Sequence, residues 1–114
     1  MHALDITRQL ATAIRETEEY KEYARLKEEI DADAGIKALL GEYRRLQTNL
    51  QMRMLSGQGM EGEESQRFQQ LNMLLFADSR TSGFLMAEMR LQKLMAEIFE
   101  TLTRAAGIEI PLPV

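Results

Sequence analysis

The chain has 114 residues, of which 45% are hydrophobic and 28% are charged, and its formal net charge at pH 7 is −4. This composition is ordinary for one globular domain with a modest core. The absence of cysteine excludes a disulfide, a thiolate nucleophile and a Cys-ligated metal or iron–sulfur cluster. No stretch approaches the roughly 20 apolar residues that span a bilayer, and residues 1–5 do not resemble a secretory signal. We therefore expect a cytoplasmic protein without a membrane segment.

The first half of the chain predicts two helices of different character. Residues 3–16 place Ile6, Leu10 and Ile14 on one helical face. Thr17 is a suitable N-cap for a second helix that reaches about Ile30, because its hydroxyl can accept a hydrogen bond from the first turn. Residues 17–33 carry seven acidic and three basic side chains, whereas residues 34–56 carry one acidic and four basic side chains. These opposite charges either orient helices toward one another or form solvated faces.

The strongest apolar pattern lies on a third predicted helix, over residues 34–55, which Asp33 is placed to cap. Its apolar positions recur at steps of three, four and seven residues: Ile36, Leu39, Leu40, Tyr43, Leu46, Leu50 and Met54. Gly41 interrupts this helix at a cost of up to about 1 kcal/mol relative to alanine. Either a partner helix approaches closely at this glycine, or it is a tolerated surface residue.

Residues 56–62 contain three glycines and predict a flexible reversal of the chain. A fourth helix begins at Glu63 or Glu64 and carries an apolar face of Phe68, Leu71, Leu74 and Leu75. Asp78 is a suitable cap between this helix and a last one over residues 79–106, although the two helices could also be continuous. Gly107 suits the position after the end of the last helix.

These elements predict an all-α fold, an antiparallel helical hairpin or bundle of about five helices in which the third and the last are long. Residues 1–107 form one predicted helical domain, and residues 108–114 form an extended apolar tail.

Packing of helix against helix is the dominant feature of the sequence. Seven-residue spacing relates Phe84, Leu91 and Ile98 on the last helix, as it relates residues of the third helix. We therefore predict partner-binding positions on these two helices, although one sequence does not separate core from interface. The predicted positions are Ile36, Leu40, Tyr43, Leu50, Met54, Phe84, Glu88, Leu91 and Ile98.

Further apolar residues lie off these faces, among them Met73 and Phe76 on the fourth helix and Leu85 and Met89 on the last. Apolar residues on two faces of one helix indicate a second partner surface. The sequence therefore predicts a homodimer or a higher homo-oligomer.

Glu88 falls in a row with Met95 and Leu102 inside the apolar sector of the last helix. A carboxylate in such a sector needs a hydrogen-bond donor to offset its desolvation. Arg44 or Arg45 of the third helix could supply this donor. Glu88 is therefore either a structural residue, as a polar contact that fixes the helix register or as a boundary position, or part of a ligand-binding site.

Nothing in the sequence indicates catalysis or a cofactor. His2 is the only histidine, so neither a histidine-based catalytic set nor a paired Glu-x-x-His metal site can be assembled. The basic residues of the third helix, Lys37, Arg44, Arg45 and Arg53, form only a modest stripe on an acidic chain. We therefore expect a non-enzymatic protein without metal or cofactor, and direct binding of nucleic acid is not expected.

The helical spacings resemble those of the YlbF/YmcA/YheA group of small bacterial proteins over nearly the whole chain. The residues that carry the resemblance are Leu10, Ala11, Ile14, Glu19, Tyr20, Tyr23, Ile30, Asp33, Leu39, Leu40, Glu42, Tyr43, Leu46 and Gln47, then Phe84, Leu85, Ala87, Glu88, Leu91, Leu94, Met95 and Ile98. The similarity is greatest to the cysteine-free branch of that group.

The resemblance implies a dimeric, cytoplasmic, all-helical protein without catalytic residues. Better studied members act in competence, sporulation and biofilm control, within a complex that assists an RNA-degrading endonuclease. The cysteine-held iron–sulfur clusters associated with that complex do not carry over, because this chain has no cysteine. We therefore expect a self-associating adaptor, regulatory in RNA processing or development, with a regulatory protein as a candidate partner. The alternatives are an RNA-binding accessory protein and a chaperone-like binder of apolar helices.

Overall fold

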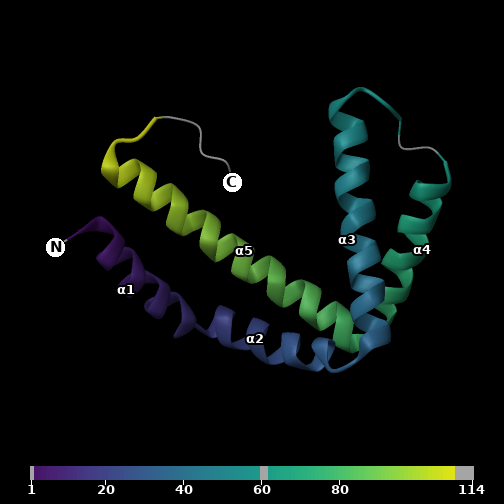
Figure 1. The fold of residues 1–114 in the computed structure, drawn as a ribbon, viewed down its shortest axis with the longest axis horizontal. Coiled ribbons are helices and arrows are strands. Elements are labelled where there is room, and N and C mark those ends of the chain that lie inside the picture. The colour runs from purple at the N-terminus through teal and green to yellow at the C-terminus, as the bar shows by residue number, and fades with distance from the viewer. Residues whose placement is uncertain (1, 60–61, 110–114) are drawn as a thin grey trace. The chain divides into compact units, whose positions relative to one another are not determined.

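The computed structural model describes residues 2–59 and 62–109. Over these ranges the chain forms helices and no strand: α1 (Ala3–Arg15), α2 (Glu18–Asp31), α3 (Ala34–Leu55), α4 (Glu63–Ala77) and α5 (Ser79–Ala106), shown in Figure 1. The predicted all-α class, with a long third and a long last helix, is confirmed. No helix of the described part combines the length and apolar content that a membrane crossing requires.

The chain divides into two compact units, whose boundaries fall within α2 and α5. Unit 1 comprises residues 1–24 and 86–114, and unit 2 comprises residues 25–85. Unit 1 therefore contains α1, the first half of α2 and most of α5, whereas unit 2 contains the rest of α2, all of α3 and α4 and the first residues of α5. One domain over residues 1–107 stays a prediction, and residues 110–114 of the predicted tail lie outside the described part.

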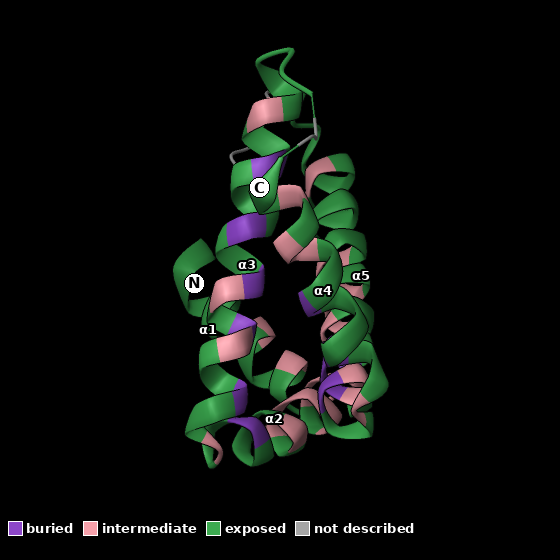
Figure 2. Cartoon of the chain, turned by 90° about the vertical axis from the view of Figure 1, so that its right-hand side faces the viewer, coloured by how far each residue is buried: buried purple, intermediate pink, exposed green. Residues whose placement is uncertain are grey.

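Unit 2 has a core built around a hairpin of α3 and α4, which lie side by side in Figure 1. The buried residues of α3 recur at three- and four-residue steps along one face of the helix, and Figure 2 shows them as successive purple segments. The buried apolar residues of the unit are Ile30, Ile36, Leu40, Tyr43, Leu46, Leu50, Leu71, Leu75, Phe84 and Leu85. The periodicity of the third helix therefore marks its core face.

Polar and aromatic contacts fix the register of the hairpin. The ring of Tyr43 stacks on that of Phe68 with centroids 5.0 Å apart, and its hydroxyl donates to Asn72 Oδ1 at 3.3 Å. At the positions directly before these two rings in the sequence, Arg67 donates from Nε and Nη2 to the two carboxylate oxygens of Glu42, at 3.0 and 2.9 Å. These hydrogen bonds lower the pKa of Glu42 and raise that of Arg67. A paired guanidinium and carboxylate in this geometry resists sliding of one helix along the other.

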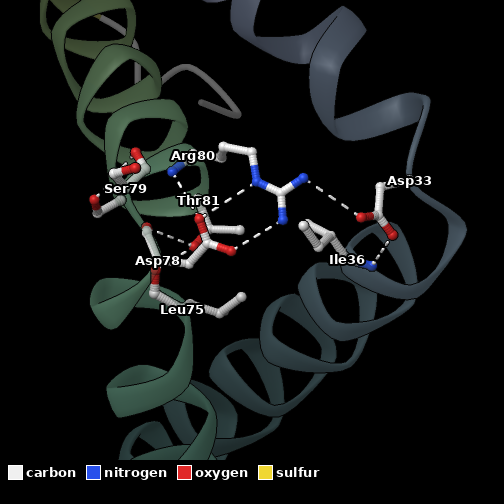
Figure 3. A network of polar contacts seen from close by, with 8 residues as sticks. Asp33, Ile36, Leu75, Asp78, Ser79, Arg80 and Thr81 are labelled. Carbon is white, nitrogen blue, oxygen red and sulfur yellow. Dashed lines mark hydrogen bonds and ion pairs between the residues drawn. The ribbon is translucent and has the colours of Figure 1, made fainter.

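The sequence left open whether the fourth and fifth helices are continuous, and the structure separates them at Asp78, whose backbone is extended (φ −91°, ψ 122°). The Thr81 hydroxyl contacts the carbonyl oxygen of Leu75, which lies in the last turn of α4 and lacks a helical partner there. The same hydroxyl lies 3.1 Å from the carbonyl oxygen of Asp78, which also accepts from the Ser82 amide. Figure 3 shows the surrounding polar network. Arg80 lies 3.1 Å from the Asp78 carboxylate and 3.5 Å from that of Asp33, which precedes α3. Hydrogen bonds from Arg80 lower the pKa of Asp78.

The predicted helix ends are confirmed. Thr17 Oγ1 accepts from the Tyr20 amide at 3.2 Å, and Asp33 Oδ1 accepts from the Ile36 amide at 3.1 Å. Gly107 has a φ of +70°, and its amide and that of residue 108 donate back to residues 104 and 103. This paired pattern is a Schellman motif, which satisfies the last carbonyl groups of α5.

Gly41 lies on the exposed side of α3, and a Cβ atom added there would have no neighbouring atom within 4 Å. Within one chain it is therefore a surface glycine. The other interpretation, close approach by a helix of a second chain, stays a prediction.

Candidate interaction surfaces

The partner-binding residues predicted from the sequence have different environments in the structure. Five of them are already covered within unit 2, namely Ile36, Leu40, Tyr43, Leu50 and Phe84. Met54, near the end of α3, is 59% exposed. Glu88, Leu91 and Ile98 lie on the part of α5 that belongs to unit 1, and all three are half-buried.

Unit 1 covers its apolar residues much less completely than unit 2. None of the 13 residues of α1 is buried, although this helix is strongly amphipathic. Leu4 and Ile6 remain 68% and 50% exposed. Among the described residues of this unit, only Ala87 is buried. The apolar stripe of α5 is therefore left partly open to solvent along its length.

Part of this stripe lines a groove of about 590 Å³ beside Tyr23 of α2. Its other lining residues all come from α5: Glu88, Leu91, Gln92, Met95, Ala96 and Phe99. They recur over three turns of α5, a length of about 16 Å at 1.5 Å per residue. The volume is typical of a pocket that binds a ligand or a side-chain cluster. We name this surface the α5 groove.

The structure brings Glu88 and Leu91 together in the α5 groove, as the sequence predicted for a shared apolar sector. It does not place Ile98 there. Sequence reasoning did not select Tyr23 and Phe99, whose proximity depends on how α2 lies against α5 within unit 1. Met95 carried a usable signal, since it falls in the same seven-residue row as Glu88.

Ile98 lines a second, shallower groove of about 330 Å³ in unit 1. Leu10 of α1 contributes to this groove, together with Leu94 and Leu102 of α5. At 100° per residue, Leu94, Ile98 and Leu102 are centred roughly a quarter of a turn around the helix from the α5 groove. α1 and α2 therefore cover only part of the apolar sector of α5.

Charged residues border the apolar surface of unit 1. Arg90 of α5 donates to the Glu22 carboxylate of α2 at 2.7 Å, which ties the two helices together. Glu19, Lys93 and Glu97 lie around the same polar flank. This side is suited to contact with water, in contrast to the α5 groove. Nowhere in the described ranges do three His, Asp or Glu side chains gather closely enough to hold a metal ion.

Comparison with known proteins agrees with this architecture. Residues 3–105 match the family described as "Control of competence regulator ComK, YlbF/YmcA". A UPF0342 protein from Halothermothrix orenii is 31% identical over 110 residues, covering 96% of this chain and 92% of the relative. Another UPF0342 protein, from Shouchella clausii, is 32% identical over 102 residues, covering 90% of this chain and 86% of the relative.

A solved structure supports the fold. "Protein of Unknown Function (DUF964) from Bacillus stearothermophilus" superposes with a TM-score of 0.71 at 19% identity, covering 90% of each chain. At this identity the similarity shows the fold alone. The match over residues 3–105 and the relatives above 30% identity confirm the resemblance seen in the helical spacings. The chain belongs to the YlbF/YmcA family.

Proposed function

We propose that this protein is a non-enzymatic adaptor that self-associates and binds helices of partner proteins. The observation that carries the proposal is the partly uncovered apolar stripe of α5 in unit 1, with the α5 groove at its centre. Soluble proteins rarely leave contiguous apolar surface open unless it contacts another molecule.

The shape and chemistry of the α5 groove favour a helix as its occupant. An amphipathic helix places apolar side chains at steps of three, four and seven residues, which matches the repeat of Leu91, Met95 and Phe99 along the groove. Met95 can adjust its side chain to partners of different shape.

The family description refers to control of a competence regulator, which supports a regulatory role with protein partners. We propose that this chain acts in the same way in the cytoplasm, as an adaptor in RNA processing or developmental regulation. Its partners would be regulatory proteins.

The proposal is tested by affinity capture from the native cell, followed by mass spectrometry, with three baits. The wild type should retain one or a few defined proteins. Met95→Glu places a charge in the α5 groove and should lose them. Met52→Glu makes the same change at a 63% exposed methionine of α3 in unit 2 and should retain them. Far-UV circular dichroism checks that each bait is folded. Equal capture by both variants would contradict the role of the groove, and capture of nothing by the wild type would contradict the adaptor function.

Binding of RNA has less support. The exposed cations of α3 are partly engaged within unit 2, since Lys37 lies 3.8 Å from Asp31 and the Arg44 guanidinium lies 5.9 Å above the Phe84 ring. An RNA-binding protein would retain RNA at low salt and lose affinity steeply as salt rises. We expect no retention in a filter-binding assay at 50 mM salt, a concentration of the order at which phosphate contacts are strong.

A further inference from the structure

The second groove of unit 1 has an apolar lining that α1 and α5 leave partly open. Leu94, Ile98 and Leu102 of α5 line it at steps of four residues, and Leu10 of α1 also contributes. Leu94 and Ile98 are half-buried, whereas Leu102, the nearest of the three to the end of α5, is 49% exposed. The row is therefore most exposed close to the point where the chain leaves α5. We name this surface the α1–α5 groove.

The chain folds back over the last turn of α5 directly after this row. Gly107 has a φ of +70°, and the amide of Ile108 donates to the carbonyl oxygen of Thr103 at 2.9 Å. In a Schellman motif, an apolar residue at the position of Ile108 commonly packs on the helix residue at position 102 or 103. Ile108 is 44% exposed, so it retains apolar surface that a neighbour can cover. The residues that follow Ile108 therefore begin beside the open end of the α1–α5 groove.

From residue 108 onward, the sequence places a large apolar side chain at every second position. These residues are Ile108, Ile110, Leu112 and Val114. In an extended chain, alternate residues point to the same side, so the four side chains form one apolar face. The prolines at positions 111 and 113 favour this conformation, because proline fixes its own φ near −65° and restricts the preceding residue to the extended region. We name residues 108–114 the tail segment.

We propose that the tail segment binds in the α1–α5 groove of its own chain, antiparallel to α5. The apolar rows of the two surfaces have matching lengths. From position 108 to position 112, an extended chain spans about 13 Å. From position 94 to position 102, α5 rises about 12 Å. The resulting register has three levels, which pair Ile108 with Leu102, Ile110 with Ile98, and Leu112 with Leu94.

The polar groups of the tail segment are compatible with this register. Glu109, its one charged residue, is exposed and falls on the side opposite the apolar row. A single extended segment has no neighbouring strand, so burial of its backbone amides is costly. Pro111 and Pro113 carry no amide hydrogen, which removes two such donors. Thr101 and Glu97, which also line the groove, offer side-chain oxygens to the remaining amides.

Covalent attachment favours the tail segment over a separate molecule as the occupant. Because the tail segment begins beside the α1–α5 groove, its binding is intramolecular, with an effective concentration on the order of millimolar. Its prolines also reduce the conformational entropy that binding removes. The proposal does not depend on the proposed function, since other residues line the α5 groove.

Contacts between methyl groups of the intact chain, measured by NMR, test the proposal directly. Nuclear Overhauser effects should connect the methyl groups of Leu112 with those of Leu94, and the methyl groups of Ile110 with those of Ile98. A mixture of isotope-labelled and unlabelled chains separates contacts within one chain from contacts between two chains. The absence of any effect between Leu112 and the α1–α5 groove, or effects found only between different chains, would overturn the proposal.

The alternation has its own test, which the absence of native cysteine makes clean. In a Leu102→Cys background, the alkylation rate of the new thiol reports how far the α1–α5 groove is open. Leu112→Asp should raise this rate about tenfold, because a leucine that leaves an apolar site loses at least the 1.4 kcal/mol that a factor of ten represents. Pro113→Asp is the matched control, since it adds the same charge on the solvent side and should change the rate by no more than about twofold. A rate that Leu112→Asp leaves unchanged, or that both variants raise equally, would overturn this proposal while leaving the adaptor function intact.

Discussion

The α3–α4 hairpin offers a matched pair of leucines that tests which face of α4 is core. Leu71 is 0% exposed, whereas Leu74, less than one turn further along, is 56% exposed. The same change to alanine therefore removes the same atoms from opposite environments. We expect a large loss of stability from Leu71→Ala and almost none from Leu74→Ala.

The size of the effect follows from the burial. Replacing a fully buried leucine by alanine costs about 2–5 kcal/mol, which combines lost transfer free energy and the cavity left behind. For Leu71, which is fully buried, we expect about 3 kcal/mol, near the middle of that range. For a chain of 114 residues this loss lowers Tm by about 12 °C. An exposed site away from special contacts changes stability by no more than about 0.5 kcal/mol, which lowers Tm by about 2 °C.

Thermal and urea unfolding followed by far-UV circular dichroism measure both variants. The protein concentration should be a few micromolar or less, because dimer formation would add to the apparent stability. Equal Tm shifts in the two variants would refute the assignment of Leu71 to the core.

Four further predictions follow from the described contacts. Gly41→Ala should raise the unfolding free energy by about 1 kcal/mol, measured in urea, because no atom lies near the added Cβ. Gly107→Ala should lower it by about 1 kcal/mol, because φ at this position is +70°. Hydrogen bonds to Glu42 and Asp78 hold the pKa values of these carboxyl groups below their unfolded-state values of about 4. Their contribution to the unfolding free energy should therefore be complete above that pH and be lost as the pH falls through the lower folded-state pKa values. Urea unfolding at a series of pH values between about 6 and 2.5 measures this loss, and Glu42→Gln should make the unfolding free energy less dependent on pH. Hydrogen exchange should be slow for the central amides of α3 and fast throughout α1, which has no buried residue; equal protection would contradict the contrast between the units.

The helix boundaries could be predicted because their causes are local. Thr17 and Asp33 cap helices through amides three residues later, and Gly107 ends α5 through its own backbone conformation. The break at Asp78 could not be settled from the sequence, because it depends partly on contacts from outside the segment. Arg80 bridges Asp78 to Asp33, which is remote in sequence.

The apolar periodicity predicted which side chains share one face of a helix, but not how far other helices bury that face. The same seven-residue spacing relates Tyr43 to Leu50 on α3 and Leu91 to Ile98 on α5. The first pair is buried against α4 and its neighbours in unit 2, whereas the second is half-buried in unit 1. Spacing within a helix fixes which side chains share a face. How much of that face is covered depends on the number of other helices that reach it, which no local pattern records.

The two units therefore differ in what an additional helix can contribute to each. In unit 2, Leu71 and Leu75 have almost no apolar surface left to bury, so a partner can add contacts only on the outer sides of α3 and α4. In unit 1, each half-exposed side chain of the α5 groove retains surface whose burial is worth roughly 25 cal/mol per Å². A helix that covers Met95 and Phe99 gains that free energy without disrupting an existing core. The buried contacts of unit 2 specify the hairpin whether or not a helix covers the α5 groove.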